Sequence, residues 1–207
     1  MSWRWPVTLS HSLPDGQALT LRPLARADRV EFEALLQVNA GWLAPWEATS
    51  PHTSARGVTR APFHRMRRSA DRAARQGLVL PLVVDVDGRM VGQVQLFDIL
   101  WGGRQTGWAG YWLAREETGR GYATWALAAL VDHALLDVGL HRVEVAIRPE
   151  NSASLRVVGR LGLREEGAQR GLMHVDGGWR DHRSFAVLAE DLDPGGLVGR
   201  LRSSPAP

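Results

Sequence analysis

The sequence predicts a single α/β domain over residues 1–193, followed by a flexible tail over residues 194–207. Its periodicity gives the element order β-α-α-β-β-β-α-β-α-β-β, without an internal repeat or a linker. Two apolar runs joined by Asp87-Gly88 are a strong hairpin signal. We therefore expect one sheet with antiparallel hairpins, packed against helices.

The N-terminal half contains the first six of these elements. Residues 18–24 alternate as a strand does, and residues 27–39 predict a helix whose Asp28 and Glu31 match a capping box. A second helix is expected from Pro62 to a stop at Gly77. The hairpin strands 80–86 and 89–100 and a strand over 106–114 then form a meander. Between the two helices, residues 41–57 are expected to be irregular.

The C-terminal half alternates helices and strands. Residues 121–139 predict a long alanine-rich helix that Gly139 ends. A strand is expected over 141–149, and then a helix from Asn151, a good N-cap, to Gly162. Two more strands are read in residues 163–174 and 179–190.

Composition excludes several classes of protein. The chain has 207 residues, 44% of them hydrophobic and 23% charged, as is ordinary for a globular domain. No apolar run approaches the roughly 20 residues that span a bilayer, and we expect no signal peptide. Without cysteine there is neither a disulfide nor a thiolate nucleophile. The seven histidines are scattered, so we expect no metal site. Because we expect neither a signal peptide nor disulfides, we also expect a cytoplasmic protein.

All 25 basic residues are arginines, and the net charge is only +3. This balance does not require a nucleic-acid partner. One face of the expected helix from Pro62 nevertheless carries four arginines, Arg65, Arg68, Arg72 and Arg75. The pattern leaves two interpretations open, a solvated helix face or a patch for an anionic partner.

The stretch "REETGRGYATWAL", residues 115–127, places a glycine turn immediately before the long helix. Unpaired N–H groups and the helix dipole make a helix N-terminus an anion site. Gly119 and Gly121 would let the backbone approach a phosphate without a Cβ in the way. The stretch is no P-loop, because the chain has no lysine. A Rossmann fingerprint fails too, because Thr124 stands where the third glycine belongs.

The chain resembles the GNAT superfamily of N-acetyltransferases. The pyrophosphate loop of that family, Gln/Arg-x-x-Gly-x-Gly/Ala, matches residues 118–123 except at Thr118. "LTLRPL", "WLAPWE", "GYWLARE", "HRVEVAIRPENSASLRVVGRLGLREEG" and "WRDH" occur in the order found in the branch with the ribosomal-protein alanine acetyltransferases RimJ and RimL. The resemblance implies the GNAT fold, a mixed, mostly antiparallel sheet with helices on both faces and a splayed acetyl-CoA cleft between its two central strands.

The resemblance also implies how acetyl-CoA is bound. The backbone N–H of Leu113 would contact the thioester carbonyl, an oxyanion-type contact. The residues expected around the pyrophosphate are Arg115, Gly119, Arg120, Gly121, Ala123 and Thr124. Asn151 would contact the pantetheine amides. Since Thr118 replaces the usual Gln/Arg, we expect weaker cofactor binding.

Catalytic roles follow from the same resemblance. Ser154 matches a serine that protonates or hydrogen-bonds the departing thiolate in RimL-like enzymes. The glutamate of those enzymes is replaced here by Met173, and strand alternation points the adjacent His174 the other way. Glu144, on the strand after the long helix, is therefore our expected base. Trp42, Trp46 and Glu47 are expected to shape the acceptor site.

The expected reaction is direct transfer of acetyl from acetyl-CoA to an amine, and the favoured acceptor is the α-amine of a protein N-terminus. An α-amine has a pKa of about 7.7–8.0, so a useful fraction is neutral at pH 7. Two alternatives stay open: a small-molecule amine acetyltransferase, and a non-catalytic acyl-CoA-binding or RNA-associated protein. A homodimer is also left open; we expect no membrane partner, and nucleic acid only indirectly, through ribosomal proteins.

Overall fold

The computed structural model describes residues 3–52 and 62–203, and its centre is one sheet of eight strands. The strands are β1 Leu9–Ser12, β2 Ala18–Arg22, β3 Leu80–Val86, β4 Arg89–Leu100, β5 Thr106–Leu113, β6 Arg142–Ile147, β7 Arg164–Val175 and β8 Gly178–Leu188. Their spatial order is β1-β2-β3-β4-β5-β6-β8-β7, and only β5 and β6 pair in parallel. The predicted mixed, mostly antiparallel sheet is confirmed.

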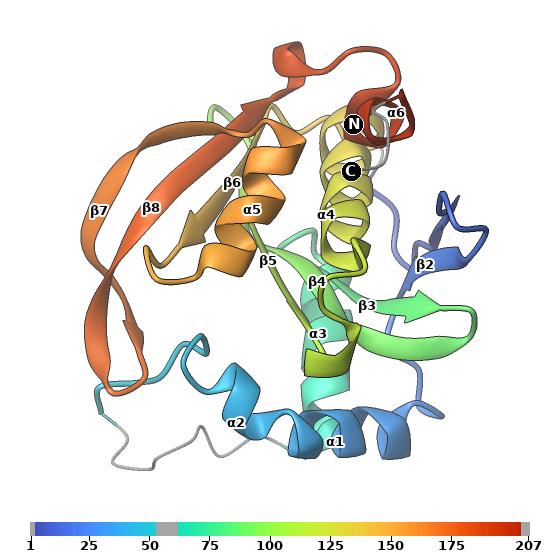
Figure 1. Cartoon of the computed structure of the whole chain (residues 1–207), viewed down its shortest axis with the longest axis vertical. Coiled ribbons are helices and arrows are strands. Elements are labelled where there is room, and N and C mark those ends of the chain that lie inside the picture. The colour runs from blue at the N-terminus through green and yellow to red at the C-terminus, as the bar shows by residue number, and fades with distance from the viewer. Residues whose placement is uncertain (1–2, 53–61, 204–207) are drawn as a thin grey trace.

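Helices cover both faces of this sheet (Figure 1). They are α1 Arg29–Val38, α2 Ala40–Leu43, α3 Phe63–Arg75, α4 Tyr122–Asp132, α5 Ser152–Leu161 and α6 Gly196–Ser203, with short helical turns η1 Arg115–Glu117, η2 His133–Asp137 and η3 Ala189–Asp191. The larger core lies between the sheet and α4, α5 and α6. A smaller core, around Phe32, Phe63, Val83 and Met90, joins α1 and α3 to the other face.

The hairpin between β3 and β4 has the turn that its sequence predicts. Asp87 and Gly88 have φ values of 51° and 82°, the left-handed pair that a two-residue type I′ turn requires. The structure adds elements that the sequence analysis missed: β1, α2, and the π-helical turn η2 that continues α4. Part of the segment expected to be irregular, residues 53–57, lies outside the described residues.

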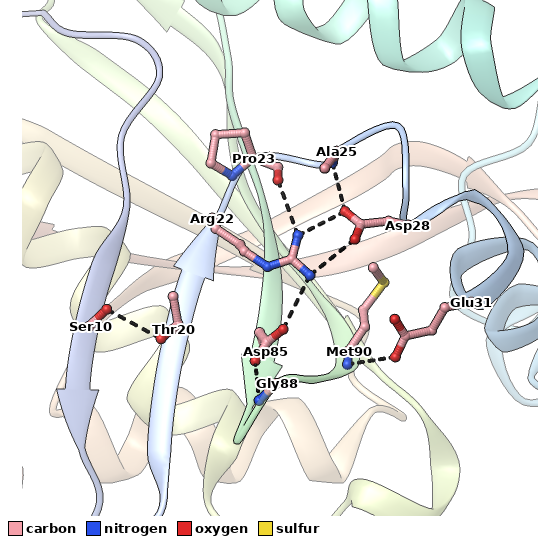
Figure 2. A network of polar contacts seen from close by, with 10 residues as sticks. All are labelled: Ser10, Thr20, Arg22, Pro23, Ala25, Asp28, Glu31, Asp85, Gly88 and Met90. Atoms are coloured by element: carbon pink, nitrogen blue, oxygen red, sulfur yellow. Dashed lines mark hydrogen bonds and ion pairs between the residues drawn. The ribbon is translucent and has the colours of Figure 1, made fainter.

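The capping box predicted for α1 does not form (Figure 2). The carboxylate of Asp28 accepts hydrogen bonds from the Ala25 N–H and the Arg22 guanidinium, which also bonds Asp85 of β3. These two carboxylates raise the pKa of Arg22, with the Asp28 hydrogen bond the largest cause. Glu31 instead accepts the backbone N–H of Met90 at 2.9 Å. Both acids therefore join α1 to the sheet, an arrangement that helix propensity cannot anticipate.

The C-terminal segment is a helix and not the flexible tail that we predicted from residue 194. Leu197 and Val198 of α6 are buried against the main core. The Asp132 carboxylate, at the end of α4, accepts their backbone N–H groups at 2.7 and 2.9 Å. Long-range capping and apolar burial therefore order a segment whose Pro-Gly-Gly start suggested fraying. Residues 204–207 lie outside the described part of the chain.

The two central strands diverge, as expected. β5 and β6 pair only from Thr106 to Trp108 and from Arg142 to Glu144. Beyond Trp108, β5 continues beside β4 alone.

No described helix is long and apolar enough to cross a membrane.

Candidate active site

A cavity of about 650 Å³ opens where β5 leaves β6. Its walls come from α2 and the residues just after it, the end of β5, the glycine turn before α4, and one face of α5. The volume lies within the range of about 300–1,000 Å³ typical of small-molecule sites. Of the predicted site residues it brings together Trp42, Trp46, Leu113, Gly119, Gly121, Ala123, Thr124, Asn151 and Ser154.

The backbone N–H of Leu113 faces this gap. The Ala114 N–H donates to the Val91 carbonyl of β4 at 2.9 Å. Because antiparallel strands alternate the direction of their N–H groups, the N–H of Leu113 turns away from β4. The Leu113 carbonyl, on the same side, accepts the Trp42 indole N–H at 3.2 Å. A donor at this place could contact a carbonyl oxygen of a bound ligand, as predicted.

The glycine turn has the backbone that its sequence suggested. Gly119 and Gly121 have φ values of 82° and 84°, and Gly121 is the N-cap of α4. A Cβ built on Gly119 meets no atom within 4 Å, so the space above it is open. The first N–H groups of this 11-residue helix have no partner within the helix, which favours an anion here. The residues present therefore fit the pyrophosphate of acetyl-CoA.

Thr118, which departs from the family pattern, stabilises the turn. Its hydroxyl donates to the Arg115 carbonyl at 2.8 Å, and its side chain lines the cavity. Arg115 and Arg120 are not among the lining residues. The Arg115 guanidinium lies over the Trp42 ring, 5.9 Å from its centroid, and Arg120 lies 3.7 Å from the buried Glu117. Their contribution to phosphate binding stays a prediction.

Two arginines that the sequence analysis missed line the cavity instead. Arg156 and Arg160 are exposed on α5, four residues apart and therefore on one helix face. Their spacing within "SLRVVGRLG" was the available signal. It becomes informative only when α5 is seen to form a wall of the cavity.

A second cavity, of about 180 Å³, lies between the diverging strands β5 and β6. It shares four lining residues with the first, namely Trp46, Tyr111, Asn151 and Ser154. Asn151 caps α5 by accepting the Ser154 N–H at 3.1 Å, so the helix holds both side chains at this junction. The Tyr111 hydroxyl lies 3.5 Å from the Ser154 carbonyl, and burial raises the pKa of Tyr111 to about 12. Tyr111 is therefore a protonated group at neutral pH.

The predicted base, Glu144, lines neither cavity. It is buried, accepts the Thr106 hydroxyl at 3.2 Å, and lies 3.3 Å from the Arg142 guanidinium. Arg142 also pairs with Glu166 of β7. The prediction is corrected by this geometry, because Glu144 belongs to an ion-pair cluster that joins β5, β6 and β7. The position of Glu144 on a strand did not reveal which side chains lie beside it on that face of β6.

The segment after α2 forms part of the wall of the smaller cavity. Arg148 donates to the Pro45 carbonyl at 2.7 Å, and its guanidinium lies 5.4 Å from the Trp46 ring centroid. Farther along, Thr49 bonds His174 of β7 through both backbone and side chain, each at 2.7 Å. Glu47 lies in this segment but is not among the residues that line the cavities.

Met173 and His174, which lie where the resemblance places the glutamate of related enzymes, have different neighbours. Met173 lines the smaller cavity, whereas His174 bonds Thr49 in the segment after α2. His182 of β8 also lines this cavity, is only 4% exposed, and was missed by the sequence analysis. It belongs to the "WRDH" stretch that carries the resemblance, but the resemblance assigned it no role. In the described residues, no group of three or more His, Asp or Glu side chains could hold a metal ion.

Comparison with known proteins points to one family. The family model of the acetyltransferase (GNAT) domain matches residues 18–164. The structure is similar to Mycobacterium smegmatis RimJ, solved in complex with CoA-disulfide, with a TM-score of 0.88 and 36% identity over 96% of this chain and 95% of that chain.

Two curated relatives each match about half of this chain. The chain is 38% identical over 105 residues to YjcK of Bacillus subtilis (strain 168), covering 51% of this chain and 58% of YjcK. It is 27% identical over 106 residues to the [ribosomal protein uS5]-alanine N-acetyltransferase of Escherichia coli (strain K12), covering 51% and 55%. The matches therefore span little more than half the length of these curated relatives.

Proposed function

The chain belongs to the acetyltransferase (GNAT) family, and we propose that it transfers acetyl from acetyl-CoA to the α-amine of a protein N-terminus. The observation that carries this proposal is the meeting of two cavities at Tyr111, Asn151 and Ser154. The larger cavity offers helix-terminal N–H groups, the Leu113 N–H and two arginines to a long anionic co-substrate. The smaller one is the place for the acceptor.

Direct attack by the amine suits this geometry. The Leu113 N–H would stabilise the oxyanion that forms on the acetyl carbonyl. The Ser154 side chain at the junction would assist departure of the thiolate. Holding the two reactants together supplies much of the rate enhancement, because well-positioned groups reach effective molarities of about 10⁵–10⁸ M.

The lining of the smaller cavity favours an α-amine over a polycationic small molecule. Among its described lining residues there is no Asp or Glu, and its one formal charge is that of Arg148. A polyamine or aminoglycoside would place several ammonium groups beside this guanidinium without a carboxylate to pair them. A volume of about 180 Å³ is below the usual range for small-molecule sites and favours a small N-terminal residue. The E. coli relative is named as an alanine N-acetyltransferase, which supports this choice.

The test is a comparison of acceptors at fixed acetyl-CoA. Peptides with Ala, Ser, Met, Leu or Glu as first residue, and one with a blocked N-terminus and an internal lysine, are assayed beside spermidine and an aminoglycoside. We expect transfer to peptides with a small first residue and none to the blocked peptide. Transfer to the small amines alone would refute the peptide acceptor, whereas no transfer despite CoA binding would favour a non-catalytic protein.

A further inference from the structure

The smaller cavity needs a proton acceptor that the predicted base does not supply. Of its described lining residues, three have ionisable side chains: Tyr111, Arg148 and His182. Burial keeps the Tyr111 phenol protonated, and a guanidinium does not lose its proton in proteins. His182 is therefore the one described residue in this lining whose side chain can accept a proton near pH 7.

The ring of His182 is oriented for this role. Its Nδ1 lies 3.0 Å from the backbone carbonyl of Arg180, and a carbonyl only accepts hydrogen bonds. Nδ1 therefore carries the proton, which leaves Nε2 with the lone pair in the neutral ring. Within the described part of the chain, no hydrogen bond to Nε2 competes for that lone pair.

The surroundings of His182 keep the imidazole neutral. Desolvation by burial lowers its pKa, and the Arg148 charge lowers it further. The Arg180 carbonyl and the carboxylates of Glu150 and Asp181 act in the opposite direction without reversing the shift. The Arg148 guanidinium also disfavours an ammonium group in the same cavity, so that an acceptor amine is driven to give up its proton.

On this geometry, and resting on the proposed acetyl transfer, we infer that His182 is the general base that deprotonates the acceptor amine. Nε2 first accepts one proton from the ammonium form, the neutral amine nitrogen then bonds to the acetyl carbon, and the imidazolium releases its proton to water. The carbon–sulfur bond breaks, and the thiolate takes up the second proton that the ammonium form carried. Atoms and charge balance without an oxidant or a metal.

The first experiment replaces the base while keeping its volume. His182→Gln is compared with wild type and with His141→Gln, an exposed histidine paired with Glu190 outside both cavities. Loss of general base catalysis typically costs about 10²–10⁴-fold. We expect such a fall in kcat for a peptide acceptor in His182→Gln, an unchanged Kd for CoA, and wild-type kinetics in His141→Gln.

Two further readouts separate a base from a structural residue. Wild-type kcat at saturating acceptor should fall on an acidic limb that His182→Gln lacks. In His182→Ala, added imidazole should restore part of kcat in proportion to its neutral fraction. Met173 lines the same cavity, so Met173→Glu in the His182→Gln background offers a carboxylate as substitute and should recover activity.

These outcomes also separate this inference from the proposed function. Absence of peptide acetylation by the wild-type protein refutes the proposed function itself. An active wild type whose His182→Gln variant stays within threefold in kcat, with the same pH profile, overturns the role of His182. A larger loss of kcat in Glu150→Gln than in His182→Gln also overturns the role of His182, because it would make Glu150 the more important group. If His182→Ala fails to bind CoA, the isosteric His182→Gln variant and its pH profile decide the question.

Discussion

The side-chain oxygen of Asn39 accepts the backbone N–H of Arg115 at 2.8 Å. Asn39 follows α1, and Arg115 begins the turn that leads from β5 into the glycine loop. The Asn39 amide also donates to the Leu35 carbonyl at 2.9 Å, and the residue is 2% exposed. A single buried amide therefore joins the helix layer on one face of the sheet to the loop that is proposed to bind pyrophosphate.

Asn39→Ala should lower both stability and cofactor affinity. It leaves the part-buried Arg115 N–H without its partner, which costs about 1–3 kcal/mol. We expect a loss of that size in the free energy of unfolding by urea, and a several-fold increase in the Kd of CoA measured by calorimetry. The exposed Gln37→Ala on the same helix is the matched control and should change neither. Equal behaviour of the two variants would contradict the anchoring role.

Gly121→Ala should weaken CoA binding more than it affects the fold. A left-handed conformation costs a residue with a Cβ about 1–2 kcal/mol, and φ at Gly121 is 84°. The relaxed loop would no longer direct its N–H groups at the phosphates. Gly159→Ala is the control, because this glycine lies within α5 with open space around it. Helix propensity predicts that Gly159→Ala is neutral or stabilising by about 0.5–1 kcal/mol.

Removing the charges of Arg156 and Arg160 should reduce the affinity for CoA in a salt-dependent way. Exposed charge pairs contribute roughly 0.2–1 kcal/mol each, so Arg156→Gln with Arg160→Gln should raise the Kd several-fold. Screening shortens the Debye length to about 3 Å at 1 M salt, where the variant and wild type should converge. Arg120→Gln is expected to have a smaller effect, because Glu117 already lies beside Arg120. An effect of Arg120→Gln larger than that of the double variant would reverse this assignment.

The pH dependence of stability should report the burial of His182. Its folded-state pKa is lowered from 6.5, so the unfolded chain binds more protons between the two pKa values. The contribution is complete above the unfolded pKa and is lost as the pH falls through the folded-state pKa. Urea unfolding at pH 7.5 and pH 5.0 should therefore show a larger loss for wild type than for His182→Gln. Identical losses would show that His182 does not titrate differently on folding.

Local chemistry accounts for the parts of the fold that the sequence predicted well. Asp87-Gly88 specifies a type I′ turn, Asn151 caps α5, and Gly119 and Gly121 take left-handed conformations before α4. In each case a few adjacent residues carry the whole signal. The resemblance to the GNAT family added the mixed, mostly antiparallel sheet and the divergence of its two central strands, and the structure confirms both.

Contacts between segments far apart in the sequence decided the other features of the fold and the site. Whether Glu144 faces a cavity or Arg142, and whether Asp28 caps a helix or binds Arg22, depends on which strands lie side by side. The same is true of α6, which Asp132 caps from 65 residues away, and of His182, which reaches the cavity because β8 lies beside β6. The sequence by itself determined the turn between β3 and β4, the Asn151 cap of α5 and the glycine turn before α4, because these need only neighbouring residues. Only the tertiary structure decided which ionisable groups share the cavity, because burial and pairing arise when separate strands meet.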